Sequence, residues 1–341
     1  MRERPPYGRV DRTAEFSASP RPRVPGSWET PTYYGRPAVK SSHYRWLIAT
    51  YLFIGGLAGA AQLIAQIADL VGRQRDRAVV RTGRYVALVG ALVSPALLVK
   101  DLHTPSRWYN MMRIFRPTSP MSIGSWTLAS FGTLSGLAAA AQALEDLFGA
   151  ASGRRWARLF GLPAAIAGAL MSVYTGALLA ATSTPLWAIA PRHLPALFGA
   201  SATASASAAL SLVVEITGAP RQALRRLERL ALAVSGAELA LALATQRHWR
   251  ANGLAGPLDQ PRLAAGYRLG AAGPLVVHAL HVLAGQESRR LSTLAAASTL
   301  VGGYLLRAVL VFAGQESGRR PEDYFRMAQP TRDEGRWSTG H

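Results

Sequence analysis

Residues 46–71 read WLIATYLFIGGLAGAAQLIAQIADLV, and Asp69 carries the only charged side chain in the run. A helix rises about 1.5 Å per residue, so roughly 20 apolar residues cross the ~30 Å hydrocarbon layer of a membrane. The run is long enough to span that layer. Its many glycines and alanines are typical of helices that pack closely inside a membrane.

Seven more apolar runs follow this one along the chain. The candidate membrane helices are 46–71, 82–100, 124–147, 156–181, 194–215, 228–246, 267–285 and 291–314. The sequence therefore predicts an all-α integral membrane protein, with about eight transmembrane helices in a bundle and polar tails. An even number of spans places both ends of the chain on one side of the membrane.

The two ends of the chain differ in composition from the part between them. Residues 1–40 and 318–341 are rich in arginine, proline and other polar residues, so we expect disordered tails on either side of a transmembrane domain at 41–317. Residues 1–40 contain no apolar stretch like that of a cleavable signal peptide. The first membrane helix is therefore expected to direct insertion.

Composition supports a membrane protein and excludes several kinds of cofactor site. Of 341 residues, 49% are hydrophobic and only 17% are charged, against about 25% charged in ordinary soluble domains. The chain has no cysteine, which excludes thiolate-held zinc, iron–sulfur clusters, c-type haem and disulfides. The formal net charge is +19, but the arginines cluster between apolar runs, so anionic lipid is a better partner than nucleic acid.

The distribution of basic residues also predicts an orientation. Loops on the side away from the termini carry more Lys and Arg than the connecting loops on the terminal side. The positive-inside rule then turns the termini outward from a cell inner, or plasma, membrane. Counting the basic residues of the tails nearest the membrane removes this difference.

Two polar stretches carry a family resemblance. TYYGRPAVK (32–40) precedes the glycine-rich first run, and LLVKDLHTPSRWYNMMRIFRPTSPMSIGSW (97–126) follows the second. The latter contains D-L-x-x-P-x-R-[FW] and S-P-M-S-x-G-x-W patterns. Over about residues 32–135, the chain resembles the NrfD/PsrC family of polysulfide-reductase-type membrane subunits.

The resemblance implies an eight-helix subunit that binds a quinone, menaquinone or ubiquinone, as its substrate. Such a subunit carries no haem, iron–sulfur cluster or metal. It exchanges electrons between the quinone pool and a docked, ferredoxin-like iron–sulfur subunit, beside a catalytic subunit that could be a molybdopterin enzyme. Quinone chemistry then occurs only in the assembled oxidoreductase complex.

Several residues are candidates for the quinone site, in the half of the membrane nearest the termini. Asp101 and His103 could relay protons, and Tyr51 or Tyr174 could donate a hydrogen bond to a quinone carbonyl. Two of them also have a structural interpretation, since Asp101 could pair with Arg107 and Tyr51 could anchor its helix at the membrane surface.

Three further residues complete the candidate set. Gly55 and Gly59 could leave room for a quinone ring, although close helix packing is the more ordinary use of such small residues in membranes. Arg307 lies inside the last span, where a charge is costly, and could act in the site or neutralise Glu238 of the sixth span.

Two alternatives remain. His278 and His281 raise the possibility of haem b, but they share one helix, whereas bis-histidine haem ligands come from facing helices. Eight spans with buried charges also suit a secondary transporter or ion channel, although the sequence shows no repeated pattern of broken helices.

Overall fold

The computed structural model describes residues Val39, Tyr44, 46–72, 76–102, 104–218, 220–285 and 288–328, and all regular elements within them are helical. The long helices are α1 (Trp46–Val71), α2 (Arg77–Asp101), α3 (Pro120–Phe148), α4 (Ala151–Ala180), α6 (His193–Ile216), α7 (Arg221–Ala251), α8 (Pro261–Leu283) and α9 (Arg289–Arg319). The short ones are η3 (Pro105–Met112), α5 (Pro185–Ala188), η4 (Gly256–Asp259) and α10 (Pro321–Ala328).

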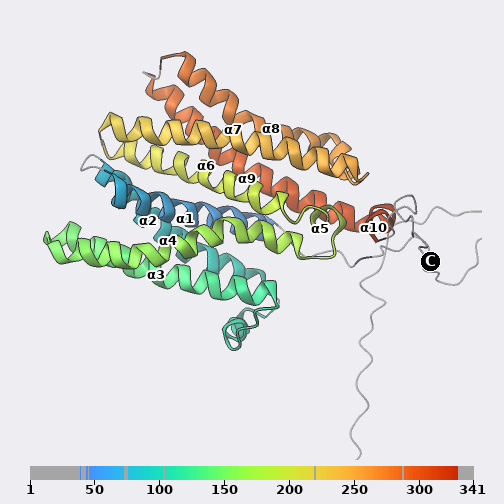
Figure 1. Ribbon diagram of the computed structural model, residues 1–341, viewed down its shortest axis with the longest axis horizontal. Coiled ribbons are helices and arrows are strands. Elements are labelled where there is room, and N and C mark those ends of the chain that lie inside the picture. The colour runs from blue at the N-terminus through green and yellow to red at the C-terminus, as the bar shows by residue number, and fades with distance from the viewer. Residues whose placement is uncertain are drawn as a thin grey trace, which may run out of the picture.

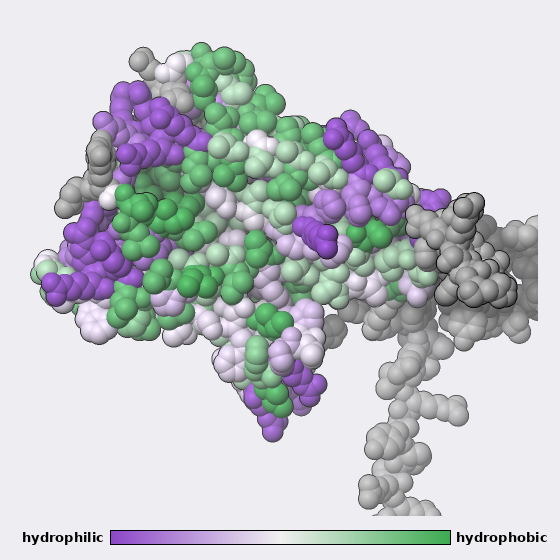
Figure 2. All heavy atoms as spheres, viewed as in Figure 1, coloured by the Kyte–Doolittle hydropathy of each residue, from purple (hydrophilic) through white to green (hydrophobic). Residues whose placement is uncertain are grey.

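Each of the eight apolar runs corresponds to one long helix, so the all-α membrane fold is confirmed. Helices α1, α2, α4, α6 and α9 are long and apolar enough to cross a membrane. The number of spans beyond these five stays a prediction. The long helices lie alongside one another, and hydrophilic residues gather toward both ends of the molecule with mostly apolar surface between them (Figures 1 and 2).

Small residues allow the helices to approach closely. A Cβ atom on Gly59 of α1 would overlap the backbone carbonyl of Gly168 in α4, and a Cβ on Gly168 would overlap Gly59 in return. Gly270 and Gly302 meet in the same way between α8 and α9. Without a hydrophobic force between helices in lipid, such close packing is a main source of helix association.

The long helices form two groups of four with the same order of packing. In α1–α4, each helix packs on the next and the first packs on the fourth, and α6–α9 repeat this arrangement. Helix α6 joins the groups through contacts with α1 and α4. Both groups begin at the same end of the bundle (Figure 1), so this is a parallel repeat of packing that the sequence pattern did not reveal.

Short elements close the end of the bundle at which α1 begins and α9 ends, which we call the terminal end. Helix α5 buries Trp187, whose indole N–H donates to the carbonyl of Leu310 in α9 at 2.8 Å. The Trp187 ring occupies the space that a side chain at Gly314 of α9 would fill. The indole N–H of Trp249 in turn donates to the carbonyl of Leu186 at 2.8 Å. These contacts fix the end of the bundle at which α1 begins.

The C-terminal boundary differs from the expected one at residue 318. Helix α9 continues to Arg319, and α10 follows it as a packed helix up to Ala328. Asp323 of α10 is buried, and Arg326 donates to the carbonyl of Gly253 at 2.6 Å. These polar contacts hold a segment whose composition alone suggested a tail. The rest of that tail and nearly all of residues 1–40 lie outside the described residues.

Candidate functional site

Three of the candidate residues come together at the terminal end of α1, α2 and α4. Tyr51 is only 3% exposed and lies close enough to Tyr174 and Tyr44 for electrostatic interaction. Asp101 is the last residue of α2 and interacts in the same way with Tyr44. We call this group of three phenols and one carboxyl group the tyrosine cluster. It consists of Tyr44, Tyr51, Tyr174 and Asp101.

Contacts with residues of α5 and α9 hold Tyr44 in this cluster. Its ring stacks on Trp187 with centroids 5.8 Å apart, and its carbonyl accepts a hydrogen bond from the side chain of Gln315. Burial raises the pKa of the Tyr44 phenol, and the nearby Asp101 carboxylate raises it further. Tyr44 is thus a protonated hydrogen-bond donor.

The S-P-M-S-x-G-x-W stretch builds the start of α3 against this cluster. Ser119 caps the helix by accepting from the backbone N–H of Ser122 at 3.4 Å, and Pro120 occupies the first turn. The Ser122 hydroxyl accepts from the backbone N–H of Arg116 at 2.9 Å. Gly124 leaves the space that the Tyr174 ring fills, so that the Tyr174 hydroxyl donates to the carbonyl of Pro120. The stretch therefore positions Tyr174.

We expect Gly124→Ala to displace Tyr174, because the added Cβ would overlap its ring and hydroxyl. Overpacking of this kind costs about 1–3 kcal/mol. Thermal unfolding of the solubilised protein should show this loss in the native background and little of it beside Tyr174→Ala, since the two changes share one space. An equal loss in both backgrounds would contradict the assignment.

Gly55 and Gly59 lie in helix contacts. A Cβ on Gly55 would stand 2.9 Å from the Met171 methyl group and 3.4 Å from the Ser94 hydroxyl, next to the tyrosine cluster. Gly59 is covered by Gly168, as described above. Of the two alternatives for Gly59, the structure supports close packing, since α4 fills the space that a ring would need.

Arg307 does not join the tyrosine cluster. Its guanidinium approaches α1 at Gly56, 3.3 Å from where a Cβ would stand. Five residues separate Gly56 from Tyr51, which turns the helix by about 140° and places the two on different faces. Arg307 donates instead to the Ser201 hydroxyl at 2.8 Å and to the carbonyl of Phe198 at 3.1 Å. It therefore belongs to the α6–α9 group.

Of the remaining candidates, His103 lies outside the described residues. The structure adds two buried hydroxyls that the sequence gave no reason to select: Ser94 of α2 and Thr175 of α4. Neither hydroxyl has a hydrogen-bond partner in the described part of the chain. Serine and threonine are common in membrane helices, so only their position beside Gly55 and Tyr174 distinguishes them.

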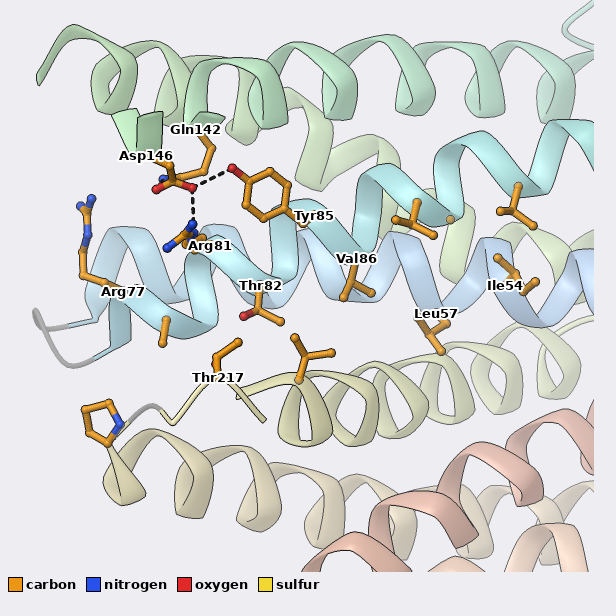
Figure 3. Close-up of a pocket in the computed structure, with 16 residues that line it drawn as sticks. Ile54, Leu57, Arg77, Arg81, Thr82, Tyr85, Val86, Gln142, Asp146 and Thr217 are labelled. Carbon is orange, nitrogen blue, oxygen red and sulfur yellow. Dashed lines mark hydrogen bonds and ion pairs between the residues drawn. The ribbon is translucent and has the colours of Figure 1, made fainter. Parts of the chain in front are cut away.

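A separate groove of about 950 Å³ opens between α2 and α6, with α1 as its floor. Figure 3 shows its polar end, where Tyr85 donates to Asp146 at 2.7 Å and Arg81 pairs with the same carboxylate at 2.8 Å. Its walls include Leu57 and Val86. The polar end lies near the start of α2, away from the tyrosine cluster at its end.

The fold and the polar groups at its ends define a multi-pass, all-α membrane protein. Residues 30–319 match the family described as polysulfide reductase, of the NrfD type, and the chain belongs to this family. It is therefore a membrane subunit of a respiratory oxidoreductase that works with other subunits of that complex. No curated protein matches the chain.

Proposed function

We propose that this subunit exchanges electrons between the membrane quinone pool and a docked iron–sulfur subunit, and that it binds the quinone headgroup at the tyrosine cluster. The gathering of Tyr51, Tyr174 and Asp101 from three helices supports this proposal most directly. Quinone carbonyls accept hydrogen bonds, and phenols donate them. The buried hydroxyls of Ser94 and Thr175 offer two more polar contacts.

Each group of the cluster has a role in this proposal. Tyr51 and Tyr44 donate hydrogen bonds that orient the carbonyls, and Tyr174 is held in place by its own bond to Pro120. Quinone reduction takes up two protons, and Asp101 or His103 relays protons to and from the quinone. Menaquinone and ubiquinone both fit these contacts. In this proposal the chain itself carries no haem, iron–sulfur cluster or metal.

The partner docks at the terminal end in this proposal. Residues 104–116, which include η3, stand out beside α3 (Figure 1) and expose Arg107, Arg113 and Arg116 together with Trp108 and Phe115. Arginine and aromatic side chains are enriched in protein interfaces. An acidic iron–sulfur subunit would complement the arginines, with a catalytic subunit, for instance a molybdopterin enzyme, attached to it. The membrane is the cell inner membrane, with the terminal end outward.

Quinone-dependent turnover of the assembled complex in membranes tests the site. We expect Tyr51→Phe, Asp101→Asn and His103→Ala to lower turnover by roughly 10- to 100-fold where the group donates or relays a proton. Tyr85→Phe makes the same chemical change in the groove between α2 and α6, and this variant should keep full turnover. Activity of the partner subunits toward a soluble dye controls for assembly in every variant.

Two results would contradict this placement. Full turnover in Tyr51→Phe, Asp101→Asn and His103→Ala, in complexes that remain assembled, would exclude the tyrosine cluster. Loss of turnover in Tyr85→Phe with normal turnover in Tyr51→Phe would move the quinone to the α2/α6 groove.

A further inference from the structure

The α6–α9 group contains buried ionisable residues that the quinone site does not use. At the end of the bundle opposite the tyrosine cluster, Glu228 of α7 accepts from the Ser292 hydroxyl at 2.5 Å. The ring of His281 in α8 lies 3.4 Å from the same carboxylate oxygen. All three residues are buried, so an acid and a base face each other inside the helix group.

One turn further along α8, His278 continues these contacts. Its Nε2 lies 3.0 Å from the hydroxyl of Thr299 in α9. Beyond this pair, Ser235 of α7 and Ser205 of α6 are buried hydroxyls with no hydrogen-bond partner in the described residues. Both side chains are fully buried, so the series of buried polar groups continues on α7 and α6.

The inner end of this series is Glu238, with Arg307 near it. The Ser201 hydroxyl donates to Glu238 and accepts from Arg307 at 2.8 Å, so that one serine joins the two charged residues. The Arg307 guanidinium lies over the rings of Phe53 and Phe198, with centroid distances of 5.6 and 5.2 Å. One carboxylate oxygen of Glu238 and Nε of Arg307 have no hydrogen-bond partner in the described part of the protein.

The spacing of these groups along each helix is regular. In α7, Glu228, Ser235 and Glu238 are separated by two turns and then one turn, and the two carboxyl groups stand about 15 Å apart along the helix. In α9, Ser292, Thr299 and Arg307 extend over about 22 Å, with two turns between successive members. A buried polar group in lipid costs free energy unless it is hydrogen-bonded, so this series needs polar neighbours throughout.

We propose that this polar file (Ser201, Ser205, Glu228, Ser235, Glu238, His278, His281, Ser292, Thr299 and Arg307) conducts protons from the end of the bundle opposite the tyrosine cluster to Glu238. Carboxyl, imidazole and hydroxyl groups all exchange protons, and water joins neighbouring members where they do not touch. The positive charge of Arg307 at the inner end disfavours the passage of metal cations.

The transfer balances one proton at a time. A proton on the Glu228–His281 pair passes along the file to the carboxylate of Glu238, and the pair regains a proton from the aqueous phase. Glu238 then gives up its proton beside Arg307, which contacts α1 at Gly56, to water that carries it to the reduced quinone. This last step rests on the proposed function, because it supplies protons to the quinone from the surface opposite to the docked partner.

The path itself can be tested without quinone. In the full-length protein in lipid vesicles, infrared spectroscopy follows hydrogen–deuterium exchange of the protonated Glu238 carboxyl, whose band is identified by its loss in Glu238→Gln. We expect Glu228→Gln to slow this exchange at least tenfold. His281→Gln provides a second interruption if Glu228→Gln does not fold. Unchanged exchange in both variants, or the absence of any band lost in Glu238→Gln, would overturn the proposal.

The matched control is Glu215→Gln. Glu215 lies at the same end of the bundle and pairs with Arg289 at 2.8 Å, but Arg289 is 75% exposed and the pair lies outside the file. We expect unchanged exchange in this variant. A slowing equal to that of Glu228→Gln would show a general effect of surface charge and would overturn the assignment of a path.

Delivery of protons to the redox site is measured in the assembled complex in vesicles, with a soluble quinone as electron acceptor and a reduced dye that feeds electrons to the partner subunits. Glu228→Gln and Glu238→Gln should reduce proton uptake from the end opposite the tyrosine cluster at least tenfold, while dye activity of the partner subunits stays normal. Unchanged uptake would overturn the delivery step. Absence of quinone turnover in the native complex would instead contradict the proposed function, and the infrared result would still decide whether the path exists.

Discussion

Gly59→Leu is expected to prevent the first four helices from packing. The leucine side chain would have to occupy the space in which the Gly168 carbonyl of α4 lies, and the backbone of α4 cannot move aside as a flexible side chain can. Gly59→Ala already forces the helices apart, at a cost of about 1–3 kcal/mol, and leucine should cost more. Unfolding of the purified protein in mixed detergent micelles measures both effects.

Gly136→Ala is the matched control for this prediction. A Cβ on Gly136 of α3 would have no heavy atom within 4 Å outside its own helix neighbourhood. The substitution should therefore leave stability unchanged or raise it by up to about 1 kcal/mol, since alanine favours a helix more than glycine does. If Gly59→Ala and Gly136→Ala behave alike, the close approach of α1 and α4 is not a source of stability.

Asp69→Ala is expected to have the second large effect. The Asp69 carboxylate accepts from Arg84 at 3.0 Å, and the side chains of both residues are at most 2% exposed. Arg158 donates to the same carboxylate at 3.0 Å. Removing Asp69 leaves the Arg84 charge buried without this partner, a change that typically costs 3–5 kcal/mol, to order of magnitude. The remaining bond from Arg84 to Gln142 carries no compensating charge.

A second substitution makes the cause testable. Arg84→Met beside Asp69→Ala removes the buried cation, so much of the lost stability should return, while Arg158 is half exposed and can turn to water. Glu215→Ala breaks a pair whose arginine is exposed and should cost less than about 1 kcal/mol. A double variant as unstable as Asp69→Ala alone would show that the carboxylate acts in some other way than by neutralising Arg84.

The sequence predicted the long helices well because their signal is local. A run of apolar residues is itself the signal for a membrane helix. Each predicted run matches one helix, and the predicted ends lie within six residues of the observed ends, apart from the start of α7. Helix α7 is the largest exception, since it begins at Arg221 and not at residue 228. Its first two turns carry several arginines, which a search for apolar runs excludes although they extend the helix beyond the apolar region.

Contacts between distant segments were much harder to predict. Nothing near Asp69 in the sequence indicates that Arg158 and Arg84 share its carboxylate, and Trp187 gives no sign of its partner in α9. The candidate set grouped Tyr51, Tyr174 and Asp101 by their expected depth in the membrane, and the structure places all three toward the same end of the bundle. Depth alone could not separate Arg307 from them, because the face of a helix and the neighbour it meets depend on how the two groups of helices pack.

The position of Trp187 has a consequence for biosynthesis. The indole of Trp187 bonds to Leu310 and fits beside Gly314, both of which leave the ribosome more than 100 residues later. The first four long helices can associate as soon as they enter the membrane, since their contacts are made among themselves. The closed end around Tyr44 and Trp187 can form only after α9 has been inserted. Nascent chains that stop before α9 would therefore expose this aromatic surface, which gives quality-control proteases a feature that separates unfinished from finished subunits.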